Sequence, residues 1–207
     1  MSNNFSFYSS PYVQCSCLNI FYLFDRFGPG PYYIEVDVDF NKSHRFFTLQ
    51  TASSDSMHHA VYMFMDMVDN KAWDDSTIVH NKDHILEISP FTIDGKKHEV
   101  DKKRHLQQLA FLEYSEKHPH EPNTLGFSGV GPGMYLNLKD NSELHGPGGN
   151  SDPCFAKVVI GLSTISHLKT ISYQFREGDG EKQMTAIKSM KIAQFSDSRL
   201  KMYGLPK

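Results

Sequence analysis

Apolar and polar side chains alternate most regularly directly after a Gly-Pro-Gly-Pro segment at residues 28–31. Every second position there is apolar and the positions between are acidic, the apolar ones being Ile34, Val36, Val38 and Phe40. A period of two is typical of a strand with one buried face. Residues 45–51 continue the pattern and predict the second strand of a hairpin.

The period changes to that of a helix over residues 57–68. Apolar side chains recur three and four positions apart, at Met57, Ala60, Val61, Phe64, Met65 and Val68. This spacing places them on one face of an amphipathic helix, and the side chains of residues 54–56 could cap its start. We interpret the methionines of this stretch as filling a core between helix and sheet.

Short apolar runs separated by Gly, Pro, Asn and Asp predict further strands along the rest of the chain. A second helix is predicted at 162–171, and the strands are expected at 76–80, 84–89, 109–114, 124–128, 134–138, 154–160 and 184–195. About eight strands with two helices favour a barrel or a sandwich. A closed barrel with helices at its ends would leave no exposed sheet edge.

The two ends of the chain differ from this region. Residues 1–30 are rich in Ser, Asn, Tyr and Phe and carry only two charges, Asp25 and Arg26. Because such a segment is too aromatic for a typical disordered tail, we expect an N-terminal extension that packs on its own domain or on a partner. The domain proper is expected over 31–196, followed by a C-terminal tail over 197–207.

Composition excludes several classes of protein. The 207 residues carry 21 Lys and Arg against 24 Asp and Glu, a net charge of −3, whereas a nucleic-acid-binding protein should show a basic stripe. No apolar run reaches the ~18 residues of a membrane-spanning helix.

Three cysteines, Cys15, Cys17 and Cys154, are too few for a disulfide framework, and we expect packing or free thiols. The compartment stays open, including an organellar or secretory lumen if an upstream targeting segment was removed.

Residues 124–160 carry the most recognisable motifs of the chain. They include a glycine-rich stretch ending in Met-Tyr-Leu-Asn-Leu, a His-Gly-Pro-Gly-Gly loop at 145–149, and Cys-Phe-Ala-Lys-Val-Val-Ile-Gly from Cys154 onward. The last run is similar to the Val-Phe-Gly-Lys-Val-Val-x-Gly strand of cyclophilins. The chain resembles this family over residues 31–196, and it looks closest to divergent, algal-type members, which share the pairs and triplets Trp73-Asp74, Glu113-Tyr114-Ser115 and Pro119-His120-Glu121.

The resemblance implies a mainly β fold: a closed, eight-stranded antiparallel cyclophilin-like barrel capped by two helices. It also implies prolyl cis–trans isomerisation, whose barrier of ~18–20 kcal/mol arises from amide resonance. The family favours the twisted amide with an arginine that donates to the proline nitrogen, while an aromatic pocket holds the proline ring. No cofactor or covalent step is required.

Carrying the family motif over residue by residue indicates a degenerate active site. Residues 76–80 match the family's Ser-Thr-Phe-His-Arg stretch, so His80 occupies the position of the catalytic arginine. A neutral imidazole offers one donor where a guanidinium offers five. Losing a charged donor to the transition state lowers the rate on the order of 10²–10³. The family's glutamine on the next strand falls near Ile88, which cannot form a hydrogen bond.

The proline pocket is expected around Tyr135, which replaces the phenylalanine that forms its floor. Met134 and His145 complete the expected substrate-binding set. The family's tryptophan position falls near Leu144 or His145, and the position of its pocket histidine falls near Asp152. The resemblance therefore implies that the scaffold persists while most catalytic side chains have changed.

The eleven histidines of the chain do not by themselves predict a metal site. His58 and His59 are adjacent on the predicted helix, so their side chains should point about 100° apart. His118 and His120 flank Pro119 and could face one ion, but no Cys or carboxylate at ligand spacing accompanies them. We therefore expect neither a metal nor a cofactor.

Two functional hypotheses follow. The first is a cyclophilin-like binding or structural module with weak or no isomerase activity, held in a larger assembly through residues 1–30, because aromatic residues are enriched at interfaces. The alternative is an active but slow peptidyl-prolyl isomerase acting on X-Pro peptides. Both hypotheses make a proline-containing peptide a candidate ligand.

Overall fold

The fold is that of a computed structural model, which describes residues 23, 25–40, 43–53, 55–80, 83–89, 107–147, 151–174 and 183–205. The side chains of residues 40, 80, 171–174, 183 and 184 lie outside this description. Most of the N-terminal extension, with Cys15 and Cys17, is also outside the described residues.

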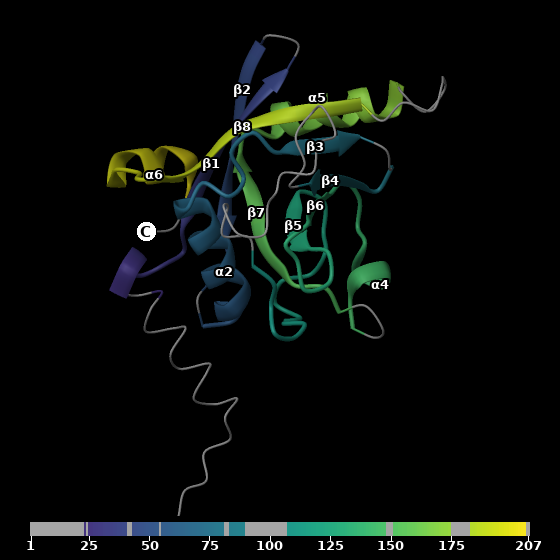
Figure 1. Ribbon diagram of the computed structural model, residues 1–207. Helices are drawn as coiled ribbons and strands as arrows, with labels where there is room; N and C mark the ends of the chain where they lie inside the picture. Colours follow the sequence, from purple (N-terminus) through teal and green to yellow (C-terminus); the bar gives the residue numbers. More distant parts are fainter. Residues whose placement is uncertain are drawn as a thin grey trace, which may run out of the picture.

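Eight antiparallel strands close into a barrel in the order β1-β2-β7-β5-β6-β4-β3-β8 (Figure 1). This architecture confirms the predicted fold class. The strands are β1 (Tyr33–Phe40), β2 (Ser43–Thr51), β3 (Thr77–His80), β4 (Ile85–Ser89), β5 (Thr124–Phe127), β6 (Met134–Asn137), β7 (Cys154–Ile160) and β8 (Gln183–Ala193).

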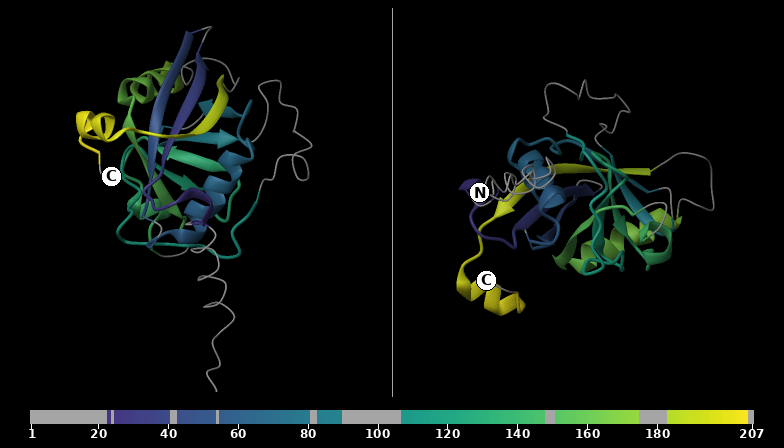
Figure 2. Two further views of the ribbon diagram at one scale, coloured as in Figure 1. Left: turned by 90° about the vertical axis from the view of Figure 1, so that its left-hand side faces the viewer. Right: turned by 90° about the horizontal axis from the view of Figure 1, so that it is seen from below.

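Two longer helices, α2 (His58–Asp69) and α5 (Leu162–Gln174), lie on opposite sides of the barrel (Figure 2). Their positions match the two predicted helices. A short helix, α4 (Ser142–His145), interrupts the loop that leads into β7, and α6 (Asp197–Tyr203) forms within the predicted C-terminal tail. The Ser196 hydroxyl caps α6 by accepting a hydrogen bond from the backbone N–H of Arg199. Across the described residues, no helix has the length and apolar character needed to cross a membrane.

The core lies inside the barrel and under α2. Of the alternating apolar residues of β1, Ile34, Val36 and Val38 point into it and are completely buried; the side chain of Phe40 lies outside the description. From α2 it receives Phe64 and the methionines at 63, 65 and 67, all buried, which confirms the interpretation of those methionines as core residues. The single tryptophan, Trp73, is also completely buried.

The end of the predicted N-terminal extension packs against its own domain. Leu23 is fully buried in the core, and the Tyr32 hydroxyl donates a hydrogen bond to the carbonyl oxygen of Gly28 at 2.6 Å. The guanidinium of Arg26 bridges two carboxylates of α2, those of Asp66 and Asp69. The described residues between 23 and 30 therefore pack on the barrel.

Two local predictions are wrong for one shared reason. Residues 109–114 form an irregular loop instead of a strand, and α2 starts without a cap from residues 54–56, since its N-cap is Met57 with no side-chain hydrogen bond. The carboxylate of Glu113 takes this role, accepting from the backbone N–H groups of His59 at 3.3 Å and Ala60 at 2.7 Å. A cap supplied from more than 50 residues away leaves no local signal in the sequence.

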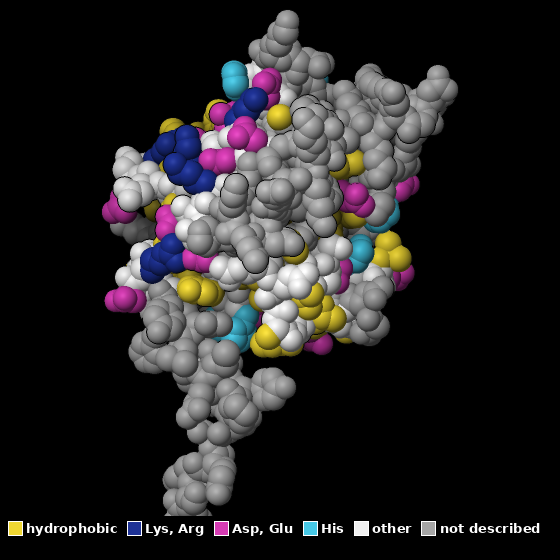
Figure 3. Space-filling model, in the orientation of Figure 1, with side chains coloured by type: hydrophobic (Ala, Val, Ile, Leu, Met, Phe, Trp, Pro, Cys, Tyr) yellow, Lys and Arg dark blue, Asp and Glu magenta, His cyan; other side chains and the backbone are white. Residues whose placement is uncertain are grey.

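The face of the molecule seen in Figure 3 carries charges of both signs close together. On this face, Lys and Arg side chains lie among Asp and Glu side chains. Among the described residues, an ion pair joins Lys188 of β8 to Asp39 of β1, with Nζ and Oδ2 3.6 Å apart. The described residues on this face thus present mixed charge rather than the basic stripe on which nucleic-acid backbones depend.

Candidate functional site

Strand β6 divides the expected substrate-binding residues between two faces of the barrel wall. Met134 and Leu136 point inward and belong to the hydrophobic core. Because successive side chains of a strand point to opposite faces, Tyr135 between them lies on the outer side. The structure therefore brings Tyr135 and His145 together and places Met134 elsewhere, in the core.

Tyr135 is the centre of a compact polar cluster, which we call the Tyr135 cluster: His120, Tyr135, His145 and Asp152. The Tyr135 hydroxyl donates a hydrogen bond to Oδ2 of Asp152 at 3.0 Å. The ring of His145 lies against that of Tyr135 with centroids 4.7 Å apart, and the ring of His120 stacks at 5.9 Å. As a result Tyr135 is only 2% exposed.

Asp152 ties three segments of the chain together. Its Oδ1 accepts a hydrogen bond from the backbone N–H of Gly129 at 3.0 Å, and its Oδ2 lies 3.1 Å from Nδ1 of His145. Its own backbone N–H donates to the carbonyl oxygen of His145, also at 3.1 Å. The alignment with the family's pocket histidine places Asp152 beside Tyr135, which is where it lies.

The geometry defines the protonation of His120, which is completely buried. Its Nε2 lies 3.0 Å from the carbonyl oxygen of Asp152, and since a carbonyl only accepts, Nε2 carries the proton. Nδ1 then carries the lone pair: it lies 3.3 Å from the Tyr135 hydroxyl, whose proton goes to Asp152, and 3.5 Å from the Asn137 amide nitrogen, which can donate to it. Burial lowers the pKa of His120 and raises the pKa of Tyr135, so both side chains are neutral near pH 7.

Gly126 on β5 forms the floor of the cluster. A Cβ atom at this position would lie 2.9 Å from the carbonyl oxygen of Pro153 and 3.3 Å from both His120 and Tyr135. Only a glycine allows both rings to pack so closely on the strand. The Tyr135 cluster is thus a closely packed hydrogen-bonded network.

The buried histidine makes stability depend on pH. In the unfolded chain His120 titrates near 6.5, whereas burial lowers its pKa in the folded state. Between the two values the unfolded state binds the additional proton, so acid favours unfolding. We expect the free energy of unfolding to be unaffected by His120 above pH 6.5 and to fall as the pH drops through the folded pKa.

Urea unfolding at pH 7 and pH 5 tests this prediction. Replacing His120 by Asn should reduce the loss of stability between the two pH values, whereas the same change at the exposed His44 should leave the loss as it is in the wild type. An unaltered pH dependence in the His120→Asn variant would contradict the assigned burial and protonation.

The positions matched to the family's glutamine and to its catalytic arginine lie in β4 and β3. Ile88 points into the core, and the residue of β4 that faces Tyr135 across the ladder is Glu87. The position matched to the catalytic arginine, His80, ends β3 and pairs with Gln183 of β8; its side chain is outside the described residues. Strand β4 separates β3 from β6.

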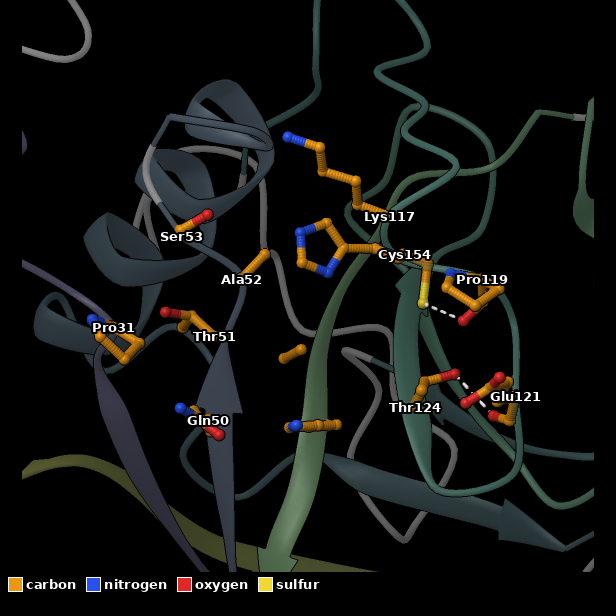
Figure 4. Close-up of a pocket in the computed structure, with 13 residues that line it drawn as sticks. Pro31, Gln50, Thr51, Ala52, Ser53, Lys117, Pro119, Glu121, Thr124 and Cys154 are labelled. Carbon is orange, nitrogen blue, oxygen red and sulfur yellow. Dashed lines mark hydrogen bonds between the residues drawn. The ribbon is translucent and has the colours of Figure 1, made fainter. Parts of the chain in front are cut away.

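A cavity of about 390 Å³ lies on the outer side of the neighbouring strands β2, β7 and β5 (Figure 4). Gln50 and Thr51 line one wall and Glu121 and Thr124 the opposite wall. The sequence did not single out this cavity, because its lining comes from four separate segments and has no common motif.

The described residues that line the cavity include no activated nucleophile. The thiol of Cys154 points to the carbonyl oxygen of Pro119, 3.4 Å away, and burial raises its pKa to about 11. A thiol in this state is unreactive at neutral pH. The Nε2 atom of His118 lies 2.8 Å from the hydroxyl of Ser56, so His118 and His120 engage separate partners instead of one ion.

Comparison with known proteins identifies the fold. No protein-family model and no curated protein sequence matches the chain. Among solved structures, it is similar to the cyclophilin-type peptidyl-prolyl cis–trans isomerase of Cryptosporidium parvum, with a TM-score of 0.57 and 11% identity over 80% of this chain and 99% of that chain. A structure of that isomerase in the presence of the dipeptide Ala-Pro gives 0.54 and 12% over 78% and 99%.

The Mimivirus cyclophilin is similar to the same extent, with a TM-score of 0.55 and 13% identity over 80% of this chain and 91% of that chain. At such identities the likeness concerns the fold alone. The TM-scores of 0.54 to 0.57 over most of this chain relate its closed eight-stranded barrel to the fold of these cyclophilin structures. The chain therefore folds as a divergent cyclophilin-like domain.

Proposed function

We propose that the chain is a cyclophilin-like protein-binding module with weak or no prolyl isomerase activity, working as part of a larger assembly. The observation that carries the proposal is the burial of Tyr135, which is 2% exposed. The family resemblance makes this residue the floor of the proline pocket. Here its ring is covered by His145 and its hydroxyl is bound to Asp152.

A proline ring could reach Tyr135 only by displacing His145. That displacement would remove the ring contact of His145 with Tyr135 and its approach to the Asp152 carboxylate. The His145 side chain is 19% exposed, so it lies at the surface and covers the tyrosine. Binding energy used to open the site is not available to stabilise the twisted amide.

The second support is the chemistry of position 80. A histidine aligned with the catalytic arginine supplies at most one donor in its neutral form and no permanent charge. Removing such a donor lowers a rate on the order of 10²–10³. The covered pocket and the missing guanidinium act on separate requirements of the reaction, namely the binding of the ring and the stabilisation of the amide.

The activity assay follows the isomerisation of an Xaa-Pro tetrapeptide. We expect the wild-type rate constant to lie at least about 100-fold below that of a competent cyclophilin measured in parallel. A rate constant within a few-fold of the competent enzyme would overturn the proposal and support the alternative, an X-Pro isomerase.

The assembly part of the proposal assigns partner binding to the aromatic N-terminal extension. Because Leu23, Arg26 and Phe27 belong to the barrel domain, the informative deletion removes residues 2–22 and keeps 23–30. We expect this variant to unfold at the wild-type temperature and to lose its comigration with a large complex on native gels of source-cell extract. Comigration equal to that of the full chain would contradict the assignment.

A further inference from the structure

A second side-chain cluster lies at the start of α2, away from Tyr135. It consists of His58, His59 and Glu113, and one donor atom from each lies within 4.8 Å of the others. The adjacent histidines do not diverge as expected from their neighbouring positions on a helix: their ring centroids are 4.0 Å apart. The first turn of α2 and the loop before β5 together bring the three side chains to one point.

The separations suit a small transition-metal ion. Tetrahedral ligands at about 2.1 Å from Zn²⁺ lie about 3.4 Å from one another. Nδ1 of His58 and Oε1 of Glu113 are 3.6 Å apart, which is close to that value. The remaining pairs lie within 4.8 Å of one another, so they would need to approach by up to about 1.4 Å to reach the tetrahedral separation.

The surroundings favour ligands over ion-pair partners. His59 and Glu113 are buried, and the His58 side chain is 19% exposed. The edge of Phe111 packs against His59 with centroids 4.8 Å apart and shields the cluster on one side.

The imidazole of His58 lacks a hydrogen-bond partner for one of its buried nitrogens. Nε2 of His58 is buried without a hydrogen-bond partner, and Nδ1 faces the Glu113 carboxylate at 3.6 Å, beyond the range of a hydrogen bond. A buried polar ring left in this way destabilises the fold. Coordination of a metal ion through Nδ1, the nitrogen that faces Glu113, would give this poorly satisfied ring one strong partner.

We propose that His58, His59 and Glu113 form a binding site for a divalent transition-metal ion of the zinc type. Two imidazoles and one carboxylate are a donor set that Zn²⁺ accepts, leaving a fourth position for water. The N-terminus of α2 disfavours a cation on its own, and the charge of the Glu113 carboxylate offsets this effect. The ion would link α2 to the loop at residues 107–121.

The test uses the full chain and zinc alone. Isothermal titration with Zn²⁺ should give one equivalent bound with Kd at or below ~1 μM. The variants His58→Gln and Glu113→Gln should each weaken binding at least 100-fold. Glu113→Gln keeps an oxygen that can cap α2, and His58→Gln changes a partly exposed side chain, so the two variants differ in their risk to folding.

The matched control is His44→Gln, because His44 is an exposed histidine whose Nδ1 lies 3.7 Å from the Asp37 carboxylate. This variant should bind Zn²⁺ as the wild type does. Zinc should also raise the unfolding temperature of the wild type and of His44→Gln, and not that of Glu113→Gln. The proposal is overturned if the wild type binds no stoichiometric zinc, or if its affinity is unchanged in both His58→Gln and Glu113→Gln.

Discussion

Replacing Asp152 by alanine is expected to lower the free energy of unfolding by about 4 kcal/mol. The change removes the acceptor of the Tyr135 hydroxyl and of the Gly129 N–H, and it removes the carboxylate beside His145. The buried Tyr135 hydroxyl would lose its acceptor, at about 1–3 kcal/mol, and the partly buried Gly129 N–H and His145 ring would lose the same carboxylate. Urea unfolding at pH 7 measures the difference.

Two further variants test whether the loss of stability is due to the contacts of the Asp152 carboxylate. Asp152→Asn retains one carbonyl oxygen and should cost roughly half as much as the alanine change. Asp83→Ala removes a half-exposed carboxylate 3.4 Å from Lys139 and should cost less than about 1 kcal/mol. Equal and small losses for Asp152→Ala and Asp83→Ala would show that the Tyr135 cluster contributes little to stability.

Restoring catalysis is expected to need two changes rather than one. His80→Arg supplies the guanidinium, but Tyr135 remains covered by His145. We therefore expect the single variant to stay within about three-fold of the wild-type isomerisation rate. Adding His145→Ala removes the ring that covers Tyr135, and the double variant should gain at least ten-fold, part of the 10²–10³ attributed to a charged donor.

The single variant His145→Ala is the matched control for this pair. It should improve the binding of an Xaa-Pro peptide without raising the rate, because the charged donor is still missing. If His80→Arg alone gains as much as the double variant, the pocket is open in the wild type and only the donor was lost. That result would contradict the role assigned to His145.

The elements with a strong period could be predicted from the sequence. The alternation in β1 and the spacing in α2 both arise from burial of one face, and the structure buries those of the residues whose side chains it describes. The prediction of a strand at 109–114 was wrong because an apolar run without alternation can form either a strand or a loop. The segment forms a loop that carries Glu113 to the start of α2, where the carboxylate caps the helix. This contact joins segments that are distant in the sequence.

The candidate site was only partly predictable. The motif resemblance placed Tyr135, His145 and Asp152 close together, and they are. Met134 was grouped with them by its position beside Tyr135, although neighbouring residues of a strand face opposite sides. His120 could not be identified as a member, because its place in the cluster depends on a loop whose path no local pattern specifies.

The close approach of the His58 and His59 rings also could not be predicted from the sequence. Helix geometry separates adjacent side chains by about 100°, and that rule describes where the Cβ atoms point. At the first turn, however, the rings can rotate toward a common partner, and Glu113 provides one. The 100° separation of adjacent Cβ atoms therefore does not prevent long side chains in the first turn of a helix from approaching each other.

We infer that the surface around Tyr135 is closed to proline. The most direct measurement is a titration of the wild-type chain with an Ala-Pro peptide, followed by the backbone amide signals of Tyr135 and of Gly129, whose N–H is bound to Asp152. We predict no saturable shift of either signal up to ~1 mM peptide, a concentration that corresponds to about −4 kcal/mol of binding. Saturable shifts of both signals with a Kd below that concentration would contradict the claim.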